Sequence, residues 1–226
     1  MKRALFLSVI SLLARAAELE KARDMQDRPA LDRMAIQASV AAQKTPNDAA
    51  AQYKAALAQS YVAEVAIEEH DKNQAHAAAE AGIEAAKRAI AINDKSADYH
   101  RVYGQLCGQA ISANVVQGLK YGRCAKEEVE KAVQLDPKSA MNYVARGVGY
   151  YYLPPALGGG NDLAIKDFQK AIEIDAKSAD GHLWLGLALR KANKNAEART
   201  EFQKALDLNP SRVWAKQQLE KTPAGG

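Results

Sequence analysis

A short motif recurs where successive helices are expected to end, and it constrains the fold more than any other feature of the sequence. Residues 131–137, 170–176 and 204–210 read KAVQLDP, KAIEIDA and KALDLNP, and residues 88–94 are a weaker copy, RAIAIND. Proline or aspartate in the motif stops a helix. Ser96, Ser139 and Ser178 follow as expected N-caps of the next helix. The sequence therefore predicts helix–turn–helix units that must stack to bury their apolar faces.

The last unit carries the features of a known repeat family. Its diagnostic residues are Leu185, Gly186, Leu189, Ala198, Phe202, Ala205 and Pro210. These residues resemble the tetratricopeptide (TPR) family, whose unit is a helix–turn–helix of about 34 residues. The resemblance implies an all-α fold: a right-handed superhelical solenoid of antiparallel helix pairs, with about four repeats plus a capping helix.

The motif also divides the chain into segments. Residues 46–210 are the predicted TPR array, with repeats at 46–94, 95–137, 138–176 and 177–210. Residues 17–45 are a predicted N-terminal helical segment that Pro29 interrupts, and residues 211–226 are a predicted capping helix and loose tail. Residues 1–16 are a predicted signal peptide.

The repeats become shorter toward the C-terminus. The closing alanines Ala41, Ala89, Ala132, Ala171 and Ala205 lie 48, 43, 39 and 34 residues apart. Because the closing turns keep their length, the extra residues must fall between the two helices of a repeat. We expect long helices over 48–69 and 74–92, a connection over 114–121, and a loop over 153–160. Asn161 or Asp162 is the expected N-cap after that loop.

The N-terminus has the tripartite pattern of an export signal. Lys2 and Arg3 precede an apolar stretch over 4–14, and Ala16 ends a small-residue cleavage site. The stretch is shorter than the roughly 20 apolar residues needed to span a bilayer, so no membrane span is expected. The predicted location is periplasmic or secreted. The alternative is an uncleaved apolar helix start that packs on the first repeat of a cytoplasmic protein.

Composition and cysteine content narrow the partners and the compartment. Beyond residue 16 the chain has 28 basic and 27 acidic residues, so no nucleic-acid partner is expected. Cys107 and Cys124 are the two cysteines. They form either a disulfide, as export would favour, or two buried free thiols.

The resemblance implies a binding groove lined by the first helix of each repeat. Transferring the family's groove positions predicts eleven residues: Tyr53, Leu57, Arg101, Gln105, Met141, Val144, Val148, Tyr151, Leu183, Leu187 and Arg190. The family's Lys and Asn clamp for a C-terminal carboxylate is absent. The groove is apolar in its C-terminal half, which favours a protein or peptide partner, either an apolar peptide or an amphipathic helix. The alternative is packing against the chain itself or a second copy in a homo-oligomer.

No constellation of catalytic residues is recognisable, so a non-enzymatic interaction scaffold without a cofactor is predicted. Glu69, His70 and His76 match no metal-ligand spacing, and we interpret them as a hydrophilic hairpin tip. The loop at 153–160 resembles an insertion in some bacterial TPR proteins, among them the T component of TRAP-type transporters. This likeness implies an alternative function, an accessory component of a substrate-transport system that binds a small ligand.

Overall fold

The computed structural model describes residues 17–224, and these are helical with no β-strand among them. The predicted signal peptide lies outside the described residues. After a helical segment over 17–24, the helices are α2 (Arg28–Lys44), α3 (Ala49–Glu68), α4 (Lys72–Ile92), α5 (Ala97–Ala113), α6 (Gly118–Leu135), α7 (Ala140–Tyr152), α8 (Asn161–Ile174), α9 (Ala179–Lys191), α10 (Asn195–Leu208) and α11 (Val213–Lys221). Two short 3-10 turns are η1 (Val115–Gln117) and η2 (Pro155–Leu157). None of the described helices combines the length and apolar character of a membrane span.

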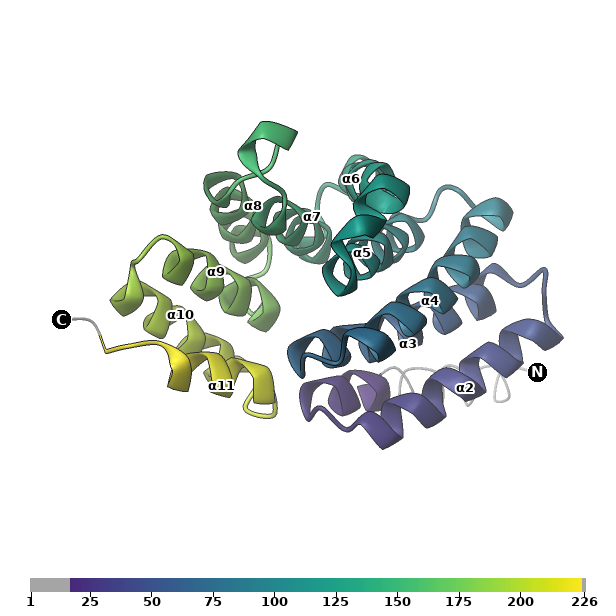
Figure 1. The fold of residues 1–226 in the computed structure, drawn as a ribbon, viewed down its shortest axis with the longest axis horizontal. Helices are drawn as coiled ribbons and strands as arrows, with labels where there is room; N and C mark the ends of the chain where they lie inside the picture. The colour runs from purple at the N-terminus through teal and green to yellow at the C-terminus, as the bar shows by residue number, and fades with distance from the viewer. Residues whose placement is uncertain (1–16, 225–226) are drawn as a thin grey trace, which may run out of the picture.

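The helices form successive antiparallel pairs around an arc. α3 pairs with α4, α5 with α6, α7 with α8, and α9 with α10, and each pair packs on the next. α11 closes the array and returns to lie beside the segment 17–24 (Figure 1). This arrangement confirms the predicted all-α solenoid of TPR type.

Repeat spacing and N-terminal caps account for the bounds of the first full helix pair, α3 and α4. α3 and α4 agree with the helices expected over 48–69 and 74–92. Asp48 begins α3 by accepting hydrogen bonds from the backbone amides of Ala50 and Ala51, and Asp71 caps α4 in the same way through Gln74. Pro29 lies in the first turn of α2, where its missing N–H costs nothing, so the predicted break falls just before it, over residues 25–27.

The core consists of two main clusters with different side chains. The first extends from the segment 17–24 to α6 and is made largely of alanine. The second joins α8, α9, α10 and α11 around Phe168, Phe202 and several leucines. Glycines allow close contact in both: a Cβ on Gly82 would meet Leu106 Cδ2 at 2.5 Å, and one on Gly186 would meet Phe202 Cε1 at 2.6 Å.

Three local expectations were wrong. The connection expected over 114–121 is shorter, because η1 ends at Gln117 and α6 begins at Gly118, so the inserted residues lengthen the helices. Neither Asn161 nor Asp162 caps α8: Gly160 takes the N-cap position at φ 124°, and the Asn161 side chain donates to the Ala188 carbonyl oxygen at 2.9 Å. The third expectation is wrong only in part: Ser96, Ser139 and Ser178 all occupy the N-cap position, but only Ser178 accepts a side-chain capping bond, from the Gly181 amide at 3.2 Å.

Candidate interaction site on the concave face

The first helices of the pairs line the concave face of the array. α3 contacts α5, α5 contacts α7, and α7 contacts α9, while the second helices contact mainly their own partners and the next first helix. In a curved solenoid, equivalent helices of neighbouring repeats lie closer together on the inner side than on the outer side. The first helices therefore form the inner, concave side of the arc. All eleven predicted groove residues belong to α3, α5, α7 and α9.

Seven of the predicted groove residues are partly exposed: Tyr53, Leu57, Gln105, Met141, Val148, Tyr151 and Arg190. Not all of them are free to meet a partner. Tyr53 stacks on Tyr99 with ring centroids 4.9 Å apart. Arg190 donates to the Gln218 side chain at 2.7 Å, which fastens α11 to α9.

The other four predicted groove residues, Arg101, Val144, Leu183 and Leu187, are buried. Arg101 is held from two sides, because it donates to Asp98 at 2.9 Å and to the Gln105 amide oxygen at 2.9 Å. Leu183 is fully buried in the second core cluster. These side chains therefore lie beneath the exposed layer of the concave face and are not available to a partner.

A group of four aromatic rings forms what we call the aromatic wall: Tyr151, Tyr152, Trp184 and Trp214. Trp184 packs edge-on against Tyr151 and Tyr152 at centroid distances of 5.8 and 6.2 Å, and against Trp214 at 5.3 Å. Tyr152 is 53% exposed.

The family's groove positions predicted Tyr151 but did not include the other three rings. A signal for Trp184 was present in the sequence. Asp180, Trp184, Leu187 and Lys191 follow one another at spacings of four, three and four residues, so they share one face of α9. Lys191 extends this face to the wall, because its ammonium lies 4.2 Å from the Tyr151 ring centroid.

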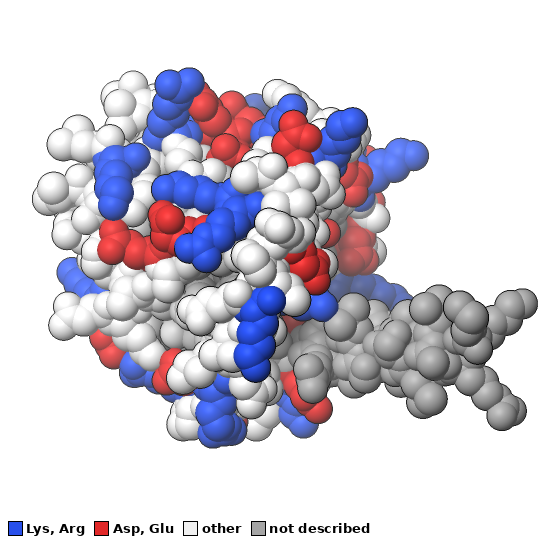
Figure 2. All heavy atoms as spheres, turned by 90° about the vertical axis from the view of Figure 1, so that its right-hand side faces the viewer, with Lys and Arg blue, Asp and Glu red and all other residues white. Residues whose placement is uncertain are grey.

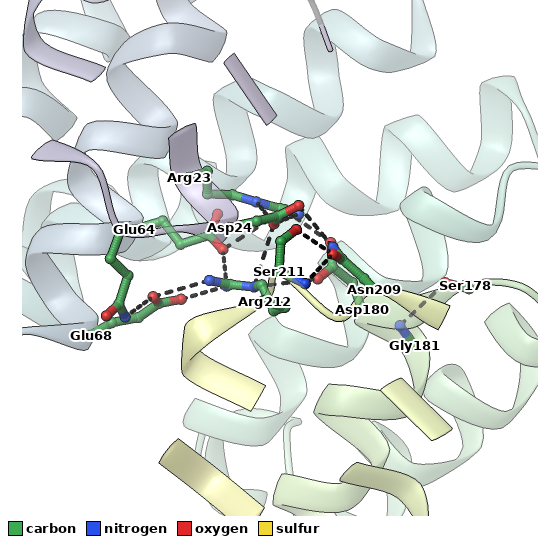
Figure 3. A network of polar contacts seen from close by, with 11 residues as sticks. Arg23, Asp24, Glu64, Glu68, Ser178, Asp180, Gly181, Asn209, Ser211 and Arg212 are labelled. Atoms are coloured by element: carbon green, nitrogen blue, oxygen red, sulfur yellow. Dashed lines mark hydrogen bonds and ion pairs between the residues drawn. The ribbon is translucent and has the colours of Figure 1, made fainter. Parts of the chain in front are cut away.

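An ion-pair network joins the two ends of the array (Figure 3). We call it the closure network, and its members are Arg23, Asp24, Glu64, Glu68, Asp180, Asn209 and Arg212. Arg212 pairs with Glu64 at 2.7 Å and with Glu68 at 2.5 Å. Its guanidinium carbon also lies 5.5 Å from the Trp214 ring centroid, which places the network against the wall.

Arg23 brings the N-terminal segment into the same network. It pairs with Asp24 at 2.7 Å and with Asp180 of α9 at 2.9 Å, and its guanidinium lies 5.0 Å from the Tyr61 ring centroid. Asn209 donates to Asp24 at 2.7 Å. The segment 17–24 thus contacts α3 and α9 through side chains outside the eleven predicted groove residues.

The closure network holds four carboxylates and two guanidinium groups. Burial raises the pKa of Glu64 to about 7, and the nearby charges of Arg23 and Arg212 offset this only in part. Burial also opposes ionisation of Asp180, but the same two arginines outweigh it and lower the pKa of that carboxyl. Two acids in one network are therefore shifted in opposite directions.

The remaining predicted features lie away from this face. Cys107 and Cys124 form a disulfide that ties α5 to α6, with their Cα atoms 6.0 Å apart. Glu69 and His70 lie at the tip between α3 and α4, where Glu69 pairs with Arg28 at 3.2 Å.

Within residues 17–224 no group of three or more His, Cys, Asp or Glu side chains is arranged to hold a metal ion. Figure 2 shows basic and acidic side chains interspersed on the face turned to the viewer.

The fold and the concave face define the class of this protein, a TPR solenoid of the kind that binds protein partners. TPR repeat models match residues 157–192 and 179–212. A model described as regulator of microtubule dynamics protein 1-3 matches residues 12–153, more than half of the chain, and the chain belongs to this family.

Curated relatives and a solved structure agree with this assignment. The chain is 28% identical over 144 residues to regulator of microtubule dynamics protein 3 of Mus musculus, covering 56% of this chain and 31% of that protein. It is 28% identical over 173 residues to the Rattus norvegicus protein of the same name, covering 69% and 36%. The chain therefore spans about a third of the length of these relatives.

A solved TPR protein of Thermus thermophilus has the same fold. Its TM-score is 0.62 at 18% identity, with 91% of this chain and 99% of that chain covered. The two relatives named above are mammalian regulators of microtubule dynamics, and neither name concerns a transport system. The predicted periplasmic or secreted location and the TRAP-type alternative stay predictions.

Proposed function

We propose that the chain is a non-enzymatic scaffold that holds an apolar peptide or an amphipathic helix of a protein partner along its concave face. The aromatic wall carries this proposal, because Tyr152 is 53% exposed while its ring is fixed against Tyr151 and Trp184. Rigid aromatic rings are frequent anchors of protein interfaces, and rings that are already ordered lose little entropy on binding. Met141 and Val148 extend the partly exposed apolar surface along α7.

The test uses a random peptide library displayed on phage, from which binders of the full chain are selected. Tyr152→Ala should weaken binding of the selected peptides at least tenfold, because it removes an exposed anchor. Leu208→Ala is the matched control, since Leu208 is 40% exposed at the end of α10. Peptides that bind Tyr152→Ala and Leu208→Ala equally well would show that the concave site is wrong.

The family supports a second, compatible function, a role in microtubule dynamics. The observation in its favour is the match of residues 12–153 to a family described by that role. The chain spans about a third of its relatives, so this activity must be measured on the chain itself. Co-sedimentation with polymerised tubulin tests it. Saturable pelleting supports a microtubule partner, and recovery of all protein in the supernatant at about 10 µM tubulin, a concentration above typical micromolar dissociation constants, counts against it.

We also propose that residues 1–16 direct export and are removed. The Cys107–Cys124 disulfide supports this, because disulfides persist mainly in oxidising compartments. An intact mass of the protein from its native host, before and after reduction, is the test. A chain that starts at Ala17 and gains two hydrogens on reduction fits export. A chain that starts at Met1 would contradict the proposal, because the mature protein would then keep the apolar stretch over 4–14.

Two further predictions need their own measurements. Sedimentation equilibrium of the full chain decides whether it forms a homo-oligomer. A thermal-shift screen with small organic acids decides between a protein-binding scaffold and the transport-accessory alternative. A reproducible shift would favour the small-ligand function.

A further inference from the structure

An apolar tip projects from the junction of α5 and α6, outside the concave face. It consists of Val115 and Val116 in η1 and Leu119 in the first turn of α6. Their exposed fractions are 80%, 69% and 97%. Single exposed aliphatic residues are normal on a protein surface, but adjacent ones that expose this much area mark an interaction site.

A small hollow of about 120 Å³ lies next to the end of α5 that leads into the apolar tip. It is lined by Ile67, His70, Lys72, Ala75, Ser112 and Ala113. Ser112 and Ala113 end α5 and lead directly into η1, so one wall of the hollow and the tip are continuous in the chain. The apolar members Ile67, Ala75 and Ala113 belong to a small core cluster of their own. The tip and the hollow together form what we call the edge surface.

The structure holds the apolar tip in place although its side chains contact little. The Asn114 side chain accepts a hydrogen bond from the Val116 amide at 3.1 Å. Tyr121 donates to Glu80 of α4 at 3.1 Å, and the Cys107–Cys124 disulfide fixes the next turn of α6 to α5. A preformed apolar surface of this kind is ready to bind without a large ordering cost.

Basic side chains lie next to the tip on α6, and acidic ones begin at Glu127. Lys120, Arg123 and Lys126 follow Leu119 on α6, and residues 114–126 contain no acidic side chain. Lys120 pairs with Glu80 and Arg123 with Glu127, which leaves Lys126 without an ion pair among the described residues. α6 also begins without a side-chain cap and without an acid in its first turn. The N-terminal end of a helix carries a partial positive charge that a carboxylate stabilises.

The geometry points to the edge surface as a docking site for an amphipathic helix of a partner protein, one with an apolar stripe beside acidic residues. The stripe would cover the tip and place one side chain in the hollow, and the carboxylates would lie at the start of α6 and near Lys126. This is the helix-in-groove mode of recognition, with charge setting the specificity.

Two other occupants fit the edge surface less well. A second copy of the chain would place the same positive tips against each other across a two-fold axis. An anionic membrane typically recruits clusters of four to eight basic residues, whereas the tip has three, two of them already paired with acids. A bilayer also offers no side chain to fill the hollow.

The experiment uses a synthetic 18-residue amphipathic helix with a leucine stripe and a glutamate-rich polar face. A matched peptide carries lysine at every glutamate position. Each is titrated into the full chain to about 1 mM, and the methyl resonances are followed by NMR, which detects even millimolar affinity. The acidic peptide should shift the methyls of Val115, Val116 and Leu119 and bind at least tenfold more tightly than the basic peptide.

Variants and a membrane arm complete the test. Leu119→Gln combined with Val116→Gln should reduce the affinity for the acidic peptide at least tenfold without changing the melting temperature, while Leu208→Gln should change neither. The proposal is overturned if the tip methyls do not shift, if both peptides bind alike, or if the tip binds only vesicles of phosphatidylcholine and phosphatidylserine. Shifts confined to Met141 and Val148 would instead support the concave site alone.

Discussion

Between α2 and α6 the core is built mainly from alanine, whereas between α8 and α11 it is built from leucine and phenylalanine. The first half reaches its buried area with long helices, such as α4 at 21 residues, and the second with helices of 13 or 14 residues and larger side chains. Small side chains let helices approach closely along a greater length. The comparison teaches that one solenoid geometry can be stabilised through helix length or through side-chain volume.

Removing volume from the second half should have the largest effect. Phe202 is fully buried against Gly186, and Phe202→Ala leaves a cavity that cannot collapse around a rigid helix pair. We expect a loss of about 3–5 kcal/mol in the free energy of unfolding, measured by urea denaturation. The exposed Leu208→Ala should stay within about 0.5 kcal/mol. A loss below about 2 kcal/mol for Phe202→Ala would mean that the second half does not depend on volume.

The disulfide belongs to the first half alone, so its removal should weaken that half. It closes a loop between residues 17 apart, and Cys107→Ala with Cys124→Ser should cost about 3 kcal/mol through the unfolded chain. Hydrogen exchange should show faster opening of α5 and α6 while α9 and α10 keep their protection. Equal loss of protection in both pairs would contradict the division into halves.

Adding volume to the first half should also destabilise. Ala79 on α4 is fully buried in the alanine cluster, and Ala79→Leu must push neighbouring helices apart. We expect a loss of about 1–3 kcal/mol by the same urea measurement. Ala77→Leu is a suitable control on the same helix, because Ala77 is exposed. Unchanged stability in Ala79→Leu would show that the close approach of α3 and α4 is not required.

The closure network links the halves, and its acids predict a pH dependence. The pKa of Glu64 is raised from 4.5 to about 7 in the folded chain. The folded state therefore keeps a proton that the unfolded state loses, and Glu64 makes stability fall as pH rises from about 4.5 to about 7. Glu64→Gln removes this term. Between pH 5 and pH 8 the free energy of unfolding of the variant should rise relative to wild type by on the order of 1–2 kcal/mol. This figure is smaller than the full pKa shift would give, because solvent screens the partly exposed carboxylate.

Asp180→Asn is the matched control for the pH experiment. The pKa of Asp180 is lowered, so its contribution is present above its unfolded value of 3.8 and is lost as pH falls through the folded value. This variant should differ from wild type by a constant amount between pH 5 and pH 8. Stability curves of wild type and Glu64→Gln that run parallel over this range would contradict the assignment to Glu64.

The smallest effect concerns the serines that follow the repeated motif. Ser178 caps α9 through the Gly181 amide, so Ser178→Ala should cost about 1 kcal/mol. Ser139 makes no such bond, and Ser139→Ala should stay within about 0.5 kcal/mol in the same urea measurement. Equal losses would mean that the Ser139 hydroxyl also accepts a capping hydrogen bond from α7.

The sequence was sufficient to predict the elements that follow from local periodicity. The closing motif set the phase of each helix pair, and repeat spacing predicted the lengths of α3 and α4, because both depend on neighbouring residues. The spacing could not tell whether inserted residues at 114–121 extend a helix or form a loop. Helix extension satisfies more backbone hydrogen bonds, and α6 begins accordingly at Gly118.

The candidate site was harder to predict, because its contacts join distant parts of the chain. The family's groove positions all fall on the first helix of a pair, but they carry no information on depth, and Leu183 and Val144 are buried. Arg23 meets Asp180 across 157 residues, and Arg212 meets Glu64 across 148. No periodic pattern pairs such residues. The apolar tip was equally hard to predict, because Val115 and Leu119 lie in the connection expected over 114–121 and no local pattern indicates how exposed they are.

The closure network changes how such an array should unfold. In an open stack each repeat contacts only its neighbours, so the terminal repeats fray independently and melting proceeds inward from the ends. Here Arg212, in the turn between α10 and α11, pairs with Glu64 of α3, and Arg23 of the N-terminal segment pairs with Asp180 of α9. Neither end can therefore open without breaking ion pairs to the other. Contacts across such long chain separations form late, because closing a long loop is entropically unfavourable. The chain should therefore fold more slowly than its local contacts suggest and protect its terminal helices from exchange nearly as well as its middle ones.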